Sequence, residues 1–289
     1  MNRVVRFGLM LLVLSLLLLP SIPAQAAPTL TTVNAQVTVL EDGRLQVKYR
    51  LTFVDDDRRT QITTLGPFDP GHSQIEAHLE HGGQVSAVEM VPLGGDQYRA
   101  EFGIETGPGE TYTLEVRYVV DRYLDTTTID GVPYRVLAWA PPQWSLPIQE
   151  EIVTFIFPIE LPAEMVEPEQ VTQEVVDNAG IFVSEEVINR FDRWIYYPTP
   201  DETTGMVWLS LYVSRQDVPA NGQFEVTDVY LPARYFSATT TPEPSKPVPP
   251  GQMTPEGPRP TPLPEGSERE SPIGLLIVIQ VAFTYTAPM

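Results

Sequence analysis

Apolar residues recur at every second position through much of this chain. In residues 33–39, Val, Ala, Val and Val alternate with polar residues, and residues 45–53 carry Leu, Val, Tyr, Leu and Phe at the same spacing. Because successive side chains of a strand point to opposite faces of a sheet, this period predicts strands with one buried and one solvated face. Glu41-Asp42-Gly43 lies between the two runs, and its glycine can take the positive φ of a tight turn. We therefore predict an antiparallel hairpin here.

Similar strands are expected further along the chain. Residues 84–91 and 98–104 flank a Leu-Gly-Gly-Asp turn, and residues 112–120 alternate without a break. No long apolar stripe at helical spacing occurs between residues 28 and 237, so we expect at most a turn or two of helix, near residues 163–175. Short strands separated by Gly- and Pro-containing turns are typical of β-sandwiches. The predicted fold class is all-β, an antiparallel β-sandwich-like structure.

The spacing of these strands predicts the domain organisation. About eight candidate strands precede residue 141 and about six follow it, which favours two subdomains, with a single larger sandwich as the alternative. The predicted divisions are a signal peptide at residues 1–26, a first β-sandwich subdomain at 27–141, a second β subdomain at 142–237, a disordered Pro/Thr/Ser-rich linker at 238–271 and an incomplete transmembrane segment at 272–289.

The N-terminal prediction depends on three features in the right order. Arg3 and Arg6 precede the apolar run Gly8–Leu19, and small residues at Ala24 and Ala26 follow. This order is typical of a secretory signal peptide with a cleavage site before Ala27. An uncleaved N-terminal anchor is the alternative, but the run is short of the roughly 20 residues that a spanning helix needs.

The C-terminal prediction depends on an abrupt change of composition. Ten prolines lie between Ala238 and Ser271, with almost no large apolar residue, which predicts an extended, disordered stalk. Residues 272–283 are apolar again, as at the start of a membrane helix. The run is too short to span, contains Gln280 and has no Lys or Arg after it. We interpret the chain as a truncated or altered form of a longer membrane protein; a short apolar tail that never spans is the alternative.

Composition excludes thiol chemistry and argues against one class of partner. The chain has no cysteine, so it forms no disulfide and performs no thiol chemistry, and its stability must come from core burial. Its formal net charge is −20 at pH 7, which repels phosphate backbones and argues against a nucleic-acid partner.

The histidines and acidic clusters do not predict a metal site. All three histidines, His72, His78 and His81, lie in one short stretch, where a strand would place His78 and Glu80 on the solvent face beside His72 or His81 as a third ligand. Spacing alone does not make three or four ligands converge, so a solvated strand face is the preferred interpretation. The run Asp55–Arg59 lacks the spacing of a calcium loop and is interpreted as a turn.

The stretch LAWAPPQWSLPI, residues 137–148, holds two of the four tryptophans. Tyr134, Val136 and Ala138 alternate toward Trp139, and Pro141-Pro142 ends ladder pairing because proline has no N–H. A buried strand at Val153, Phe155 and Phe157, closed by Pro158, follows. We interpret Trp139 and Trp144 as a buried corner between strands, against the alternative of an exposed sugar-stacking platform.

A family resemblance rests on VLEDGRLQVKYRLTF, YTLEVRYVV and LAWAPPQWSLPIQEEIVTFIFP, together with the signal. These segments, within residues 33–158, resemble the N-terminal extracytoplasmic domain of YciQ-like predicted membrane proteins. The chain departs from that pattern because TQITTLGPFDPG has no Arg-containing segment and the membrane segment is incomplete. The resemblance implies an exported β-domain with a C-terminal membrane tether, and it supplies no catalytic residue because the family has no established activity.

The expected function follows from this order of segments. No nucleophile elbow, phosphate loop, dinucleotide fingerprint or HExxH motif is present in the sequence. We predict a non-enzymatic protein, anchored on the extracytoplasmic face of the cell membrane through its C-terminal segment, with an interaction or envelope-structural role. We assign no catalytic, cofactor-binding or metal-ligating residue and no cofactor, and we expect an envelope protein or polysaccharide as partner. The alternatives are a secreted carbohydrate-active or metal-dependent hydrolase, and the sensor domain of a longer membrane protein.

Overall fold

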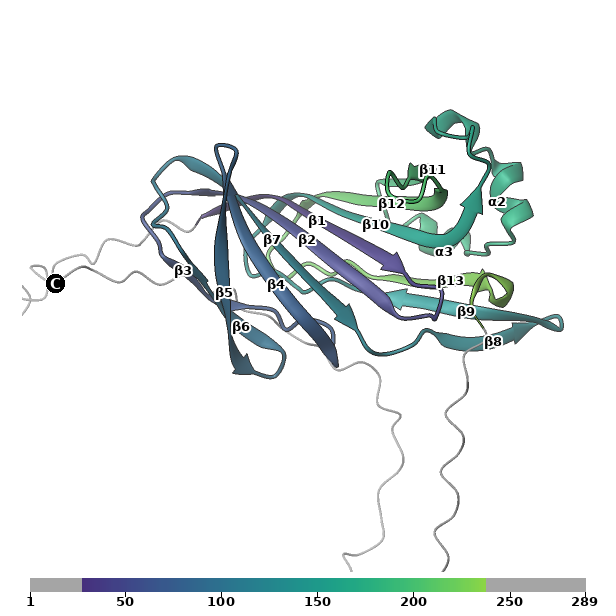
Figure 1. Cartoon of the computed structure of the whole chain (residues 1–289), viewed down its shortest axis with the longest axis horizontal. Helices are drawn as coiled ribbons and strands as arrows, with labels where there is room; N and C mark the ends of the chain where they lie inside the picture. The colour runs from purple at the N-terminus through teal and green to yellow at the C-terminus, as the bar shows by residue number, and fades with distance from the viewer. Residues whose placement is uncertain (1–27, 238–289) are drawn as a thin grey trace, which may run out of the picture.

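The computed structural model describes residues 28–237. The predicted signal peptide, linker and membrane segment lie outside the described residues. Within 28–237, no helix combines the length and apolar character that a membrane crossing requires. The described part is dominated by strands, which confirms the all-β prediction (Figure 1).

The strands of the described region form two sheets. Their bounds are β1 Thr29–Val39, β2 Leu45–Asp55, β3 Gln61–Leu65, β4 His72–His81, β5 Gln84–Gly94, β6 Gln97–Phe102, β7 Glu110–Val120, β8 Asp125–Ile129, β9 Val132–Trp139, β10 Ile148–Leu161, β11 Arg193–Pro200, β12 Val207–Val218 and β13 Val226–Pro232. The large sheet has the order β11-β12-β10-β1-β2-β7-β4-β5-β6-β3, and the small sheet has the order β13-β9-β8.

The predicted hairpins are confirmed, but the sheet is not purely antiparallel. β1 and β2 pair as expected, with Val37 opposite Val47, and Gly43 takes a φ of 90° in the turn between them. β1 also pairs with β10, and this pair is parallel. A parallel pair requires a long connection, and here it contains β2 to β9. The large sheet is therefore mixed, and the prediction of antiparallel pairing is wrong at this pair.

The small sheet packs on the large sheet through aromatic side chains. On β9, Leu137 and Trp139 are buried, whereas Tyr134 and Val136 are only half-buried and Ala138 is exposed. Tyr134, Val136 and Ala138, which the sequence pattern identified as the alternating set, therefore lie on the more exposed face of β9, opposite Leu137 and Trp139. The Trp139 ring lies 6.2 Å from Tyr49 of β2 and 6.0 Å from Phe155 of β10, measured between ring centroids.

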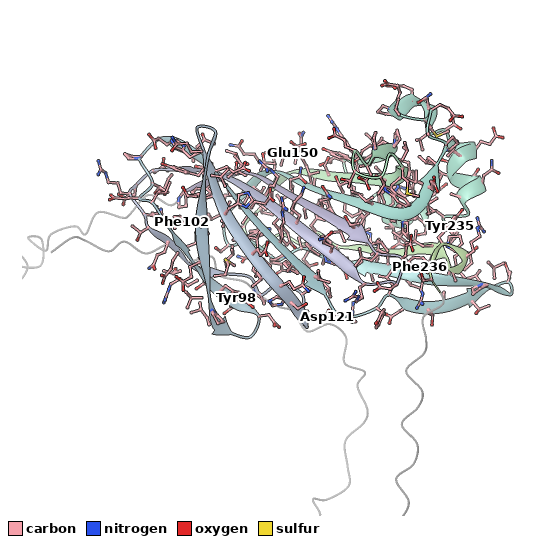
Figure 2. All side chains as sticks on the ribbon, viewed as in Figure 1. Tyr98, Phe102, Asp121, Glu150, Tyr235 and Phe236 are labelled. Carbon is pink, nitrogen blue, oxygen red and sulfur yellow. The ribbon has the colours of Figure 1, made fainter. Side chains whose placement is uncertain are left out.

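Both sheets cross the predicted subdomain boundary between residues 141 and 142. In the large sheet β1 pairs with β10, and in the small sheet β9 pairs with β13. One buried apolar cluster also contains residues from both segments. The described residues on the two sides of this boundary therefore share one buried apolar core. Figure 2 shows how far this structure extends, from Tyr98 and Phe102 near one end to Tyr235 and Phe236 near the other.

Two further features differ from expectation around β10. Pro158 does not close β10, which continues to Leu161. The ladder between β1 and β10 ends before Pro158, at Thr38 and Ile156, so the missing N–H of Pro158 breaks no pairing with β1. The helical segments of the described residues are η1 Pro168–Gln170, α2 Gln173–Ala179, α3 Glu185–Ile188 and η2 Ala233–Tyr235. They are short, but they exceed the turn or two expected near residues 163–175, and α3 and η2 lie outside that range. Between residue 141 and the end of the described region at Ser237, four strands are present instead of about six, because residues 168–188 form helical turns.

Candidate functional site

The two tryptophans of residues 137–148 are buried, as the corner interpretation predicts. Trp139 is 4% exposed and Trp144 is 3% exposed. Trp139 Nε1 donates a hydrogen bond to Asp69 Oδ2 at 3.2 Å. The Trp144 ring lies 6.1 Å from Tyr49, edge to face. Neither ring presents a face to solvent, so an exposed sugar-stacking platform at these residues is wrong.

Asp69 is half-buried and lies beside this corner. Its Oδ2 also accepts a hydrogen bond from the Tyr118 hydroxyl at 2.8 Å. Burial raises the pKa of Asp69, and the hydrogen bonds from Tyr118 and Trp139 oppose that effect. His72 joins the same region, with Nδ1 2.8 Å from the Asp69 carbonyl oxygen and Nε2 2.7 Å from the Tyr98 hydroxyl. The structure therefore uses His72 as a core residue.

A second acid faces the core from β10. Glu151 is 1% exposed and lies between Val33 of β1 and Arg215 of β12 in the sheet register. Within the described residues, Glu151 Oε1 and Trp144 Nε1 have no hydrogen-bond partner of ordinary geometry. Burial raises the pKa of Glu151 to about 8, although the nearby Trp144 N–H and the charge of Arg215 act in the opposite direction. Glu151 is therefore protonated at neutral pH.

On the outer face of the large sheet, His78 and Glu80 do share a face. Their neighbour is Glu115 of β7, and one ligand atom from each of the three residues lies within 4.8 Å of the others. The predicted third partners are elsewhere: His72 is in the core, and His81 stacks on Tyr112 with ring centroids 4.4 Å apart. The alternation of residues 112–120 marks Glu115 as outward-facing, but only the β4–β7 register places it opposite His78.

Two arginines already occupy these carboxylates. Arg50 lies 2.7 Å from Glu80 Oε2 and 2.8 Å from Glu115 Oε2, and Arg117 also pairs with Glu115. Burial acts to raise the pKa of Glu115, but Arg117 and Arg50 outweigh it and lower the pKa. A divalent cation here would have to displace the guanidinium groups and would meet their charges. The cluster is therefore an ion-pair network across β2, β4 and β7.

We expect added zinc to leave the melting temperature of the chain unchanged, because Arg50 and Arg117 hold the carboxylates that a metal would need. A thermal melt with and without zinc measures this. An upward shift that disappears in His78→Ala would show instead that the ion displaces the arginines and binds at this cluster.

The acidic run at residues 55–59 forms a turn, as predicted. Asp55 is fully buried, and its Oδ1 accepts a hydrogen bond from Arg59 Nε at 2.7 Å. Its Oδ2 accepts from the Thr106 hydroxyl, also at 2.7 Å. Both carboxylate oxygens are therefore used to hold the turn against the neighbouring loop, which leaves this side chain unsuited to calcium.

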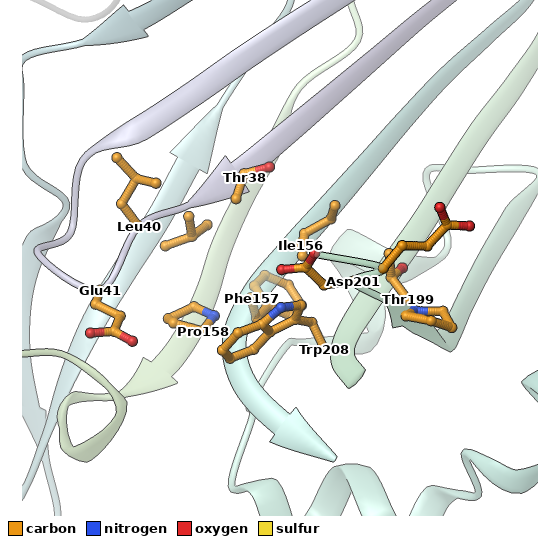
Figure 3. Close-up of a pocket in the computed structure, with 12 residues that line it drawn as sticks. Thr38, Leu40, Glu41, Ile156, Phe157, Pro158, Thr199, Asp201 and Trp208 are labelled. Carbon is orange, nitrogen blue, oxygen red and sulfur yellow. The ribbon is translucent and has the colours of Figure 1, made fainter. Parts of the chain in front are cut away.

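A groove of about 410 Å³ lies where β1 leaves β10. Its apolar surface includes Trp208 of β12, with Phe157 and Pro158 of β10, and Leu40 lies across from them (Figure 3). The groove exists because β1 turns away after Val39 while β10 continues to Leu161. No pattern in the sequence indicated it, because its walls come from four separate segments.

Three acids, Glu41, Asp201 and Glu202, also line this groove. Asp201 is committed to its own loop, since Oδ1 accepts from the Thr203 N–H at 2.9 Å and Oδ2 from the Thr204 hydroxyl at 2.8 Å. These bonds lower the pKa of Asp201, the Thr204 hydroxyl most strongly. A glycosidase general acid requires the opposite shift, so Asp201 is unsuited to that role.

Comparisons with known proteins give no family. No protein-family model matches the chain, and no curated protein matches it significantly. Among solved structures, an M1 zinc metallopeptidase from Deinococcus radiodurans is 16% identical, with a TM-score of 0.38 over 71% of this chain and 42% of the peptidase. A two-domain M1 zinc metallopeptidase mutant bound to L-arginine is 15% identical, with a TM-score of 0.39, and aligns with 70% of this chain and 42% of its own. The chain thus spans less than half the length of these peptidases, and this likeness supports no conclusion about mechanism.

Proposed function

We propose that the chain is an exported, membrane-tethered binding module with an interaction or envelope-structural role. The observation that carries the proposal is the groove beside Trp208, because a concave apolar surface with a few polar groups is the usual form of a binding site. The groove is built on β1, β10 and β12 of the ten-stranded sheet, which supplies its platform. The order of signal, β-domain, proline-rich segment and apolar end in the sequence supports export and tethering.

The three carboxylates of the groove support binding better than catalysis. Asp201 holds its own turn, and neither Glu41 nor Glu202 is buried. Acid–base catalysis by a carboxyl group at neutral pH depends on an environment that raises its pKa, and burial is the usual cause. Charged groups at an open rim act instead by attracting and orienting a partner.

We expect cell fractionation of the full-length gene product to place the protein in the membrane fraction. Protease is then added to cells from which the outer envelope layers have been removed and whose cytoplasmic membrane is still closed. It should digest the β-domain, because the β-domain faces outward. A cytoplasmic protein of similar size serves as the control that the cells stayed closed. Recovery of soluble cytoplasmic protein with an intact N-terminus would contradict the proposal.

A further inference from the structure

We propose that the Trp208 groove binds an extended peptide segment in which lysine or arginine alternates with apolar residues. The groove is the space lined by Trp208, residues 38–41 at and after the end of β1, β10 residues 156–158, and residues 199–202 at and after the end of β11. The inference rests on the proposed function, since it names the partner class of that binding module.

The shape of the groove suits an extended chain. The β1–β10 ladder ends at Thr38 and Ile156, and β10 then continues to Leu161 without a β1 partner. The space between Leu40 and Pro158 therefore runs beside the part of β10 that no longer pairs with β1 (Figure 3). Extended peptides commonly bind along such strand edges, where main-chain groups supply affinity and alternate side chains supply specificity. Pro158 has no N–H, so the side chains of the groove must supply much of the recognition.

The chemistry of the lining selects a cationic segment. Three of the twelve lining residues are acidic and none is basic. The net charge of −20 adds attraction for a cation over the whole surface and repels anionic chains. Trp208 offers an indole beside these acids, and a lysine or arginine over an indole gains a cation–π interaction. Alternate apolar residues of the same segment would lie on Ile156 and Pro158, both half-buried on this face.

The probe for the test is a fluorescently labelled Lys-Val-Lys-Val-Lys-Val peptide, added to the full chain and followed by fluorescence anisotropy. We expect saturable binding that weakens as salt is raised, and no binding of a matched Glu-Val-Glu-Val-Glu-Val peptide. The double variant Glu41→Gln/Glu202→Gln should lose about fivefold in affinity, the effect of two exposed charge pairs. Trp208→Ala should lose about tenfold or more.

Glu89→Gln is the matched control, because Glu89 is an exposed acid on β5, outside the groove lining. It makes a charge change of the same kind and should bind as the parent does. Equal losses in Glu89→Gln and in the groove variants would assign the binding to diffuse charge and overturn the proposal. Failure of the lysine peptide to bind would also overturn it, while membrane fractionation would still test the proposed function separately.

The same binding experiment also distinguishes a competing occupant of the groove, namely the continuation of this chain after Ser237. The described chain ends at Ser237, whose N–H donates to the Glu41 carbonyl oxygen at 2.8 Å, beside the groove. If the peptide binds only after the residues following Ser237 are removed by proteolysis, the groove belongs to this chain's own continuation, and the proposal of an external peptide is wrong.

Discussion

Replacing Trp139 by alanine should lower the free energy of unfolding by about 4 kcal/mol, as expected for a buried tryptophan. The ring lies between Tyr49 of β2 and Phe155 of β10, so its removal leaves a cavity between the two sheets. The Asp69 carboxyl group also loses the N–H that Trp139 donates, although Tyr118 still donates to it. A loss of this size is a large part of the 5–15 kcal/mol that holds a typical domain together.

Urea unfolding of the parent and the variant measures this effect. Trp208→Ala is the matched control, because its ring is only partly buried and lines an open groove. The control should cost well under half as much stability as Trp139→Ala. If Trp139→Ala unfolds at the same urea concentration as the parent, the buried-corner interpretation is wrong.

Replacing Glu151 by glutamine should stabilise the chain at pH 7 by about 3 kcal/mol. The carboxyl group is 1% exposed, and burial raises its pKa to about 8 from the ordinary 4.5. Between these two values the folded chain keeps a proton that the unfolded chain releases. The free energy of unfolding therefore falls as pH rises from about 4.5 to about 8, by about 1.4 kcal/mol per pH unit. Glutamine has nearly the same shape and no proton to lose, so this fall is absent.

The measurement is the difference in free energy of unfolding between Glu151→Gln and the parent at several pH values. The difference should be near zero at about pH 4.5 and should grow toward pH 8. Carboxylates with a lowered pKa, such as Glu115 and Asp201, also make the free energy of unfolding depend on pH. Their contribution is the same in both proteins, so it cancels in the difference. Glu150→Gln is the control, because Glu150 adjoins Glu151 on β10 but is not fully buried. Parallel pH curves for Glu151→Gln and the parent would contradict the assignment.

Part of the candidate chemistry was within reach of the sequence. The same alternation that places Val153, Phe155 and Phe157 in the core also places Glu151 there, two residues earlier. The pairing of His78 and Glu80 on one face was predicted from period two alone. Their partner Glu115 and the two arginines that neutralise the cluster depend on the β2–β7–β4 register. No local pattern reports register between strands that are far apart in the sequence.

The sequence by itself determined several of the strands with their buried faces, at residues 33–39, 45–53, 112–120 and 153–157, and it favoured a buried position for Trp139 and Trp144. These properties follow from the period of two and from turn residues such as Gly43, and both act over a few residues. Only the tertiary structure decided that β1 and β10 pair in parallel, that one core crosses residue 141, and that a groove opens beside Trp208. Those outcomes depend on which distant strands bury each other's apolar faces best. The sequence pattern does not decide this, because a strand with alternating apolar residues can pair with many neighbours.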